Sequence, residues 1–444
     1  FALSPAWLSM RSTRQCDGSF ACATRIMTGA VAEPSRAAGL TRLGEFLPQA
    51  GTRYTKSRNF DFGPDRRGNV SMLSPYLRHR LVLEQEVLQS VLQRHQLAAA
   101  NKFVDEVFWR AYFKGWLEHR PAVWDDFRAS VASLLERLEH DTSLLDRFNA
   151  AIEGNTGIDC FDAWARELVT HGYLHNHARM WFASIWVFTL RLPWQLGADF
   201  FYRHLIDGDP ASNTLSWRWI SGLHTPGKTY LARVSNIASY TNNRFNPQGQ
   251  LATSAPPLSE TRVFRSRSLP APQAIPSESR FGLLVTEEDG CPASLLDGQK
   301  PAAILGALAT RARSPLPVGI SAYDFSVGAI ADAVDRVADK FDLAGDLSTS
   351  DDWETVLVEW ASRHDLDTIV TAYAPVGPVA ESLTRASKHL ERYGIRLLQL
   401  RRPYDSITWP HARRGYFKLK NRIPALLKQL QVANDYDELG SEAV

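Results

Sequence analysis

The spacing of apolar residues divides the chain into a helical half and a half in which strands alternate with helices. Between residues 41 and 250, apolar residues recur every three to five positions, as at Val82, Val87 and Val91. This spacing gathers them on one face of an amphipathic helix. Strand-like alternation is scarce there, so we predict an all-α domain over residues 41–250.

After residue 281 the apolar residues form short runs separated by longer stretches with helical spacing. The runs predict strands at residues 282–286, 318–322, 368–372 and 395–400. The stretches between them predict helices at residues 301–313, 327–341, 353–364 and 376–393. Strands that alternate with helices favour parallel βαβ units. We therefore predict a Rossmann-like α/β domain with a parallel sheet over residues 281–432, ending in a basic amphipathic helix at 416–430.

Three segments lack either pattern. Residues 1–40 mix Ser, Arg, Ala and Gly without a period, and we expect a disordered N-terminal arm there. Residues 251–280 are rich in Pro and Ser, a composition that suits an interdomain linker. Residues 433–444 form a tail. A chain of 444 residues is long for one domain, which agrees with a multi-domain protein.

Charge and cysteine content exclude several classes of protein. The net charge is only +2, so contact with a polyanion requires a local basic patch, for which we consider Arg218, Lys228, Arg233 and Arg244. The four cysteines form no CxxC motif, which argues against a disulfide framework and against a metal site. No apolar run reaches the ~18–20 residues that a membrane span needs. We expect a cytoplasmic protein without membrane contact.

The candidate chemistry lies in one stretch of the helical half and in two motifs before it. The stretch begins with YLHNHARM, in which Asn176 and Arg179 lie three apart and share a helix face. It continues with LIDGDPASNTLSWRW, which contains Asp207, Asp209 and Asn213. The upstream motifs are SMLSPYL and DEVFWRAYF. A guanidinium held by a carboxylate can stabilise an anionic ligand.

Together these motifs resemble the flavin pocket of the photolyase/cryptochrome family. The resemblance implies a helical domain that holds FAD in a folded conformation. It assigns FAD contacts to Tyr54, Ser71, Leu73, Ser74, Arg110, Asn176, Arg179, Asp207, Asp209 and Asn213. Structural explanations compete with these roles: Ser74 can simply cap a helix, and Arg179 with Asp207 can be a structural ion pair. The histidines 171, 175 and 177 are better explained by a helix junction than by a metal.

The same resemblance implies the residues of catalysis and electron transfer. Glu106, Trp109, Met180 and Trp219 match the pocket for a pyrimidine dimer flipped out of the duplex, and Asn213 matches the residue that faces flavin N5. Trp109 as a core residue is the structural alternative. Trp217 and Trp194 match two members of an electron-transfer chain. No tryptophan stands near Asp141, where the third is expected, and Trp164, Trp181 or Trp186 offer another route.

The resemblance implies a blue-light-driven DNA photolyase, a lyase that splits cyclobutane pyrimidine dimers in damaged DNA. The alternatives are a cryptochrome-like photoreceptor without repair turnover and a helical scaffold without flavin. Known relatives place the Rossmann-like antenna domain before the FAD domain, whereas here the α/β half follows it. The sequence leaves open whether an antenna chromophore is bound or absent. We expect a monomer.

Overall fold

Helices form the chain from Arg36 to Tyr240, as the apolar spacing predicts. The structure, a computed structural model, describes residues 32–276 and 279–432. The helices of this half are α2 (Arg36–Phe46), α3 (Thr52–Ser57), α4 (Ser74–Arg78), α5 (Glu84–Arg94), α6 (Leu97–Glu118), α7 (Ala122–His140), α8 (Thr142–Glu153), α9 (Asp159–His171), α10 (Asn176–Ser184), α11 (Trp194–His204), α12 (Pro210–Ile220) and α13 (Val234–Tyr240). A π-helical turn, Ile185–Thr189, extends α10.

The helix ends follow local sequence signals. Helix α9 stops at His171 because Gly172 adopts a left-handed conformation with φ of 62°. Helix α12 starts at Pro210, directly after Asp209, whose carboxylate accepts a hydrogen bond from the Ser212 amide. The break at Gly172 separates α9 from α10. It positions the start of α10, which carries candidate site residues.

The α/β half contains a parallel sheet in the strand order β3-β2-β1-β4-β5. Its elements are β1 (Phe281–Thr286), β2 (Ala303–Ala307), α14 (Ile320–Phe341), β3 (Gly345–Ser348), α15 (Trp353–Arg363), β4 (Thr368–Ala372), α16 (Pro378–Leu390) and β5 (Arg396–Leu400). The central pairing sets Leu283 beside both Ile304 and Val370. The predicted fold class, an all-α domain followed by an α/β domain with a parallel sheet, is confirmed.

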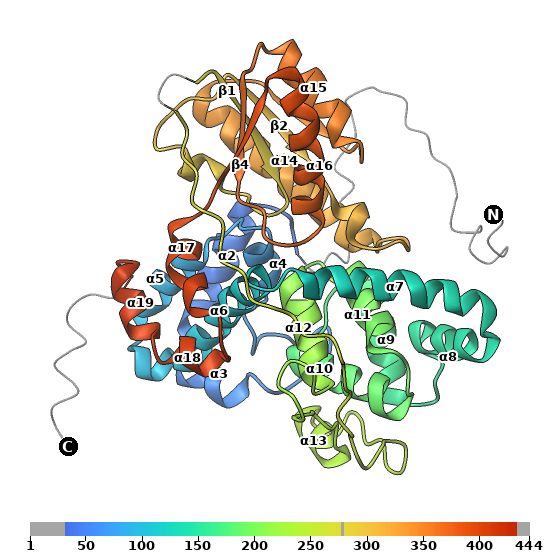
Figure 1. The fold of residues 1–444 in the computed structure, drawn as a ribbon. Helices are drawn as coiled ribbons and strands as arrows, with labels where there is room; N and C mark the ends of the chain where they lie inside the picture. The colour runs from blue at the N-terminus through green and yellow to red at the C-terminus, as the bar shows by residue number, and fades with distance from the viewer. Residues whose placement is uncertain (1–31, 277–278, 433–444) are drawn as a thin grey trace. The chain divides into compact units, whose positions relative to one another are not determined.

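Helices cover both faces of this sheet (Figure 1). Leu283 and Val285 of β1 pack with α14, whereas Leu284 between them packs with α15 and α16. A strand covered on both faces is buried at every position, which explains why β1, β2 and β4 are buried throughout and mostly apolar.

Two elements of the α/β half were predicted wrongly, and one was missed. Residues 301–313 were expected to be helical but contain strand β2 and a 3-10 turn at Thr310–Arg313, because their Ala-rich run is buried in the sheet. Residues 318–322 were expected to be a strand but lead into α14, and Ile320 is 74% exposed. Strand β3 is a mostly exposed edge strand without apolar alternation, so the pattern contained no signal for it.

The C-terminal helices belong to the helical half. After β5 the chain forms α17 (Pro403–Thr408), α18 (Tyr416–Lys420) and α19 (Ile423–Gln429). Their apolar side chains share one core with α5 and α6, and in Figure 1 these helices lie beside that part of the chain. The expected domain boundary at 432 and the single helix at 416–430 therefore do not hold. The helix breaks at Asn421, and Pro424 begins a new helical turn.

The predicted arm and linker also differ from expectation. Residues 36–40 form the first turns of α2 rather than part of an arm, because Gly39 and Leu43 pack into the helical core. Residues 1–31 and the tail 433–444 lie outside the described residues. The linker runs along the helices: the Arg267 amide donates to His119 O at 2.8 Å, and Thr229 Oγ1 donates to Ala255 O at 2.8 Å.

Over residues 32–276 and 279–432, no helix is long and apolar enough to cross a membrane. In the same residues, no group of three or more His, Cys, Asp or Glu side chains is arranged to hold a metal ion.

Gly115 allows the C-terminal helices to approach α6. A Cβ at this position would lie 2.8 Å from Trp409 Cα and 2.9 Å from Ala412 Cβ. We expect Gly115→Ala to lower the free energy of unfolding by about 1–3 kcal/mol, the usual cost of overpacking. Urea unfolding measures this free energy. Gly44→Ala is the control, because its Cβ meets no atom within 4 Å and should raise stability by up to ~1 kcal/mol. Equal effects of the two substitutions would contradict the close packing.

Candidate functional site

A partly buried ion pair joins α10 to the loop after α11. His175 caps α10, and Arg179 follows one turn later. The guanidinium of Arg179 donates to Asp207 Oδ2 at 2.9 Å and to Leu174 O at 3.0 Å. Burial opposes ionisation of Asp207, but Arg179 outweighs it and, with Ser74, lowers the pKa of this carboxyl. Asp207 is therefore a carboxylate that fixes the cation of Arg179 in place.

The loop from Asp207 to Asp209 is held from two sides. Arg78 of α4 donates to Gly208 O at 2.8 Å. Asp209 caps α12 through the Ser212 amide at 2.7 Å. Burial works against the charge of Asp209, but Lys114, whose Nζ lies 3.6 Å from Asp209 Oδ2, lowers its pKa together with Arg110. The loop thus presents two ionised carboxylates beside two buried cations.

The turn before α4 brings the predicted serines to this loop. Met72 adopts a left-handed conformation with φ of 55°, and Ser71 Oγ accepts a hydrogen bond from the Leu73 amide at 3.3 Å. The turn places Ser74 within hydrogen-bonding reach of Asp207. Ser71, Leu73 and Ser74 therefore lie next to the 207–209 loop, as the resemblance implies.

Several buried polar atoms in this region have no hydrogen-bond partner in the described part of the chain. They are Arg110 Nε and Nη2, Asp207 Oδ1, Asp209 Oδ2 and Ser212 Oγ. Buried polar groups are nearly always paired, since an unpaired one costs roughly 1–3 kcal/mol. A guanidinium that lacks a partner suits an anionic group such as a phosphate, and the oxygens suit N–H and O–H donors. Together these atoms favour a polar ligand.

Helix α6 carries a second group of candidate residues one turn from Arg110. Glu106 forms an ion pair with Arg58, the residue that follows α3. Burial raises the pKa of Glu106, and the Arg58 guanidinium offsets part of that rise. The indole of Trp109 stacks on Tyr416 of α18, with ring centroids 3.6 Å apart and planes inclined by 12°. Trp109 remains partly exposed, so it is neither a free surface residue nor a fully buried core residue.

The remaining pocket candidates lie on neighbouring elements. Asn213 of α12 is buried, and its Nδ2 donates to Ala198 O at 2.8 Å, which leaves the amide oxygen free for another contact. Asn176 is exposed at the start of α10. Met180 and Trp219 are partly buried against the core of α7 to α12, whereas Trp109 and Tyr54 pack against the core of α5 and α6. The candidates therefore surround the boundary between two cores.

The candidate electron-transfer residues are buried but do not stack on each other. Trp217 meets Trp186 edge to face at 6.2 Å. Trp194 stacks on Phe127 at 5.8 Å and lies 6.0 Å from the guanidinium carbon of Arg218. Trp164 and Trp181 form a further stacked pair at 5.5 Å. The pair of Trp217 and Trp186 supports the alternative route more directly than it supports a step to Trp194.

Three residues near the site were missed by the sequence analysis. Arg58 follows Tyr54 by one helical turn, a spacing that could have found it. His224, after α12, lies 3.0 Å from the Tyr112 hydroxyl and joins α12 to α6. Tyr416 comes from the distant C-terminal segment, so no local pattern pointed to it. The helix-junction interpretation of the histidines agrees with the contacts of His175 and His177, which bind the carbonyls of residues 58 and 59.

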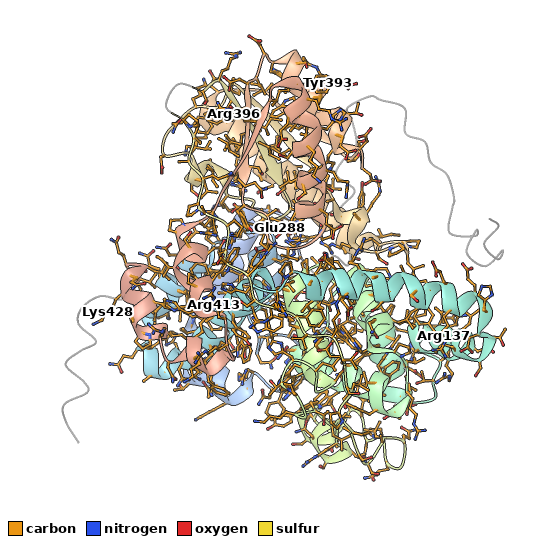
Figure 2. The ribbon with its side chains drawn as sticks, viewed as in Figure 1. Arg137, Glu288, Tyr393, Arg396, Arg413 and Lys428 are labelled. Carbon is orange, nitrogen blue, oxygen red and sulfur yellow. The ribbon has the colours of Figure 1, made fainter. Side chains whose placement is uncertain are left out.

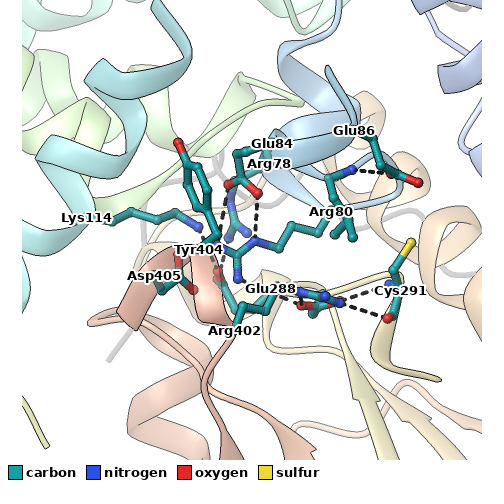
Figure 3. A network of polar contacts seen from close by, with 12 residues as sticks. Arg78, Arg80, Glu84, Glu86, Lys114, Glu288, Cys291, Arg402, Tyr404 and Asp405 are labelled. Carbon is teal, nitrogen blue, oxygen red and sulfur yellow. Dashed lines mark hydrogen bonds and ion pairs between the residues drawn. The ribbon is translucent and has the colours of Figure 1, made fainter. Parts of the chain in front are cut away.

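A network of buried charges ties this region to the sheet (Figure 3). Arg78 pairs with Glu288 at 2.7 Å, just beyond the carboxyl end of β1. Arg80 pairs with Asp405 of α17 at 2.6 Å. Lys114 lies 3.7 Å from Glu288 and 3.6 Å from Asp209, so it stands between the sheet and the candidate site.

A surface hollow lies apart from these residues. It has a volume of about 950 Å³ and is lined by the linker and by residues of α11 and α12, among them Trp194 and Arg218. None of the unpartnered atoms of Arg110, Asp207 or Asp209 faces it. We therefore place the candidate site by its chemistry rather than by this hollow.

Comparisons with known proteins agree with the geometry. Residues 103–282 match the family profile described as the FAD binding domain of DNA photolyase. The chain is similar to proteins named deoxyribodipyrimidine photo-lyase from Streptomyces griseus (33% identical, covering 42% of this chain and 41% of that protein) and Thermus thermophilus (34% identical, 49% of each). Residues 103–282 form a domain of the photolyase/cryptochrome family.

The match is limited to part of each protein. The chain spans less than half the length of these relatives. The crystal structure of a bacterial class III photolyase from Agrobacterium tumefaciens is 27% identical, with a TM-score of 0.40, and the similarity covers 48% of this chain and 43% of that one.

FAD is the cofactor of this domain family, and the residues here fit it. A pyrophosphate would accept hydrogen bonds from the two unpartnered nitrogens of Arg110. The ribose and ring donors would donate hydrogen bonds to the carboxylate oxygens of Asp207 and Asp209. The predicted FAD-binding domain is thus confirmed.

Removal of the Asp207 charge should release the cofactor. Asp207→Asn leaves Arg179 buried without its counterion, and we expect at least a tenfold loss of FAD affinity, since one charge-assisted hydrogen bond contributes roughly 1.5–3 kcal/mol. Absorbance of bound flavin per protein chain measures it. Asp199→Asn is the matched control, because Asp199 pairs with Arg203 at the same 2.9 Å but lies outside the candidate site. The control should lose stability and keep FAD. Equal flavin loss in both variants would contradict the assignment.

Glu167 should make stability depend on pH. It pairs with Arg67, but burial raises its pKa to about 7, against the opposing effect of Arg67. From about pH 4.5 to about 7 the folded state holds a proton that the unfolded state has released, so the free energy of unfolding falls as pH rises and levels off above about pH 7. The fall should be about 2–4 kcal/mol, at roughly 1.4 kcal/mol per pKa unit.

Glu167→Gln should remove this fall, as measured by urea unfolding across that pH range. Exposed Glu136→Gln on α7 is the control and should keep it. A slope that persists in Glu167→Gln would show that another group causes it.

Proposed function

We propose that the protein is a FAD-dependent, blue-light-driven DNA photolyase that splits cyclobutane pyrimidine dimers. One observation carries the proposal: α6 bears Arg110, with its unpartnered nitrogens, and within one turn of it Glu106 and Trp109. A base pocket built on those two residues would therefore adjoin the cofactor. The matched relatives named deoxyribodipyrimidine photo-lyase support the same activity.

The cofactor would be held by two sets of residues. Arg110, Tyr54 and the turn of Ser71, Leu73 and Ser74 would bind its phosphate side. Asn176, Arg179 and Asn213 would face the ring, with Asp207 and Asp209 holding the polar groups between. FAD held here in its reduced form would, when excited by blue light, supply an electron to the dimer and regain it once the two cyclobutane bonds have broken. The reaction has no net oxidation or reduction.

The protein would orient the dimer after it leaves the duplex stack. Glu106, whose pKa is raised by burial, can share a proton with a pyrimidine carbonyl, and Arg58 holds its carboxyl in position. Tyr416 backs one face of Trp109, so the opposite face can stack on the dimer. Met180 and Trp219 would close the pocket from α10 and α12. Trp217 would deliver electrons that keep the cofactor reduced, by way of Trp186 or Trp194.

A light-dependent repair assay tests the proposal. The purified protein is incubated with dimer-containing DNA under blue light, and FAD is quantified in the same sample. We expect dimers to disappear only in the light. Glu106→Gln should retain FAD and lower affinity for the dimer by about tenfold, the value of one hydrogen bond of ~1.4 kcal/mol.

Glu391→Gln, an exposed position in the α/β half, is the control and should repair like the wild type. A flavin-loaded protein that leaves every dimer intact would reject the photolyase and favour a photoreceptor.

A further inference from the structure

The C-terminal segment concentrates positive charge. Residues 406–432 contain six Lys and Arg residues and no Asp or Glu, although the net charge of the whole chain is +2. Four of these cations lie within residues 411–422, which we call the basic segment, and are exposed: Arg413, Arg414, Lys418 and Arg422.

These four head groups have no acidic partner in the described residues. Within the basic segment, only Lys420 forms an ion pair, with Asp105 at 2.5 Å. Neighbouring cations add to the local positive potential. The pKa of Arg120 is lowered by burial and by repulsion from Arg413, and that of His411 by burial and by Arg422. Unpaired cations at this density favour an anionic partner.

The basic segment is anchored to the helix that carries the candidate pocket. Tyr416 stacks on Trp109 at 3.6 Å, and its hydroxyl donates to Asp105 O at 3.0 Å. Tyr416 is itself buried, so the stack is a fixed contact and not an occupant of the pocket. The exposed cations therefore lie beside the part of α6 that bears Glu106 and Trp109. Figure 2 shows Arg413 among the helices and away from Arg396 at the sheet.

Two of the four basic residues considered from the sequence are paired. Arg218 is only 3% exposed and pairs with Glu260. Arg244 pairs with Asp61 at 2.7 Å. Lys228 and Arg233 are exposed, but they lie on the segment after α12 and do not share the contact with Trp109. The basic segment contacts Trp109 directly, through Tyr416.

We infer that the basic segment binds the phosphate backbone of the DNA strand that flanks a nucleotide held at Trp109. This inference rests on the proposed function and names the surface that contacts its substrate. Phosphate contacts of this kind position DNA without reading its sequence. The ring of Phe417, which is 75% exposed between Lys418 and Tyr416, would add a surface on which an unpaired base can stack.

The test measures DNA affinity as a function of salt for two double variants, Arg413→Gln/Arg414→Gln and Lys418→Gln/Arg422→Gln. The probes are one duplex oligonucleotide, irradiated with ultraviolet light or not. We expect each variant to bind both probes at least tenfold more weakly at low salt. The slope of log affinity against log salt should flatten by about 0.9 for each phosphate that the variant no longer neutralises. FAD content and repair at saturating DNA should match the wild type.

The matched control is Lys388→Gln/Arg392→Gln, which removes two exposed cations from the α/β half. It should keep the wild-type affinity and slope. If the segment variants bind like the control while the wild type binds and repairs DNA, this inference fails and the photolyase stands. If the wild type binds no DNA at any salt concentration, both fail. If the variants bind more weakly but the wild type repairs nothing, the surface stands and the photolyase fails.

Discussion

Arg78 is the side chain on which the arrangement of the site depends. It is 1% exposed, donates to Gly208 O and pairs with Glu288. One guanidinium therefore connects α4, the loop that carries two candidate carboxylates, and the end of β1. A buried ion pair contributes little net stability, since desolvation offsets its attraction, but it penalises other arrangements because a lone buried charge is costly. Its main effect here is to position these three elements.

The chain order makes these connections necessary. The sheet follows the helical half in sequence, and the helices after β5 return to pack on α6. That return gives α6 two neighbours, Lys420 from α18 and Trp409 at Gly115, while Arg58 after α3 contacts α6 from the N-terminal part of the chain. A site built on α6 therefore depends on residues from both ends of the described chain.

Charge distribution separates structural ion pairs from groups available to ligands. Arg218, Arg244 and Arg402 are each paired with a carboxylate. Two nitrogens of Arg110 are buried without a hydrogen-bond partner, and Arg413, Arg414, Lys418 and Arg422 are exposed without acidic partners among the described residues. The buried nitrogens of Arg110 suit a small anionic cofactor in a dry site. The exposed cations of the basic segment suit a large polyanion that binds at the surface and releases counterions.

The local sequence determined the helices and strands whose apolar residues are strongly periodic, and it determined which residues share a face or cap an end within them. The spacing of Asn176 and Arg179, the cap at Asp209 and the strand at Thr368–Ala372 follow from neighbouring residues, so each could be predicted. Strand β2 could not, since an Ala-rich run becomes a strand only when helices cover both its faces. The contact of Tyr416 with Asp105 spans 311 residues and depends on how the C-terminal helices pack. Only the tertiary structure decided it, because local propensity contains no information about which distant surface will cover an apolar face.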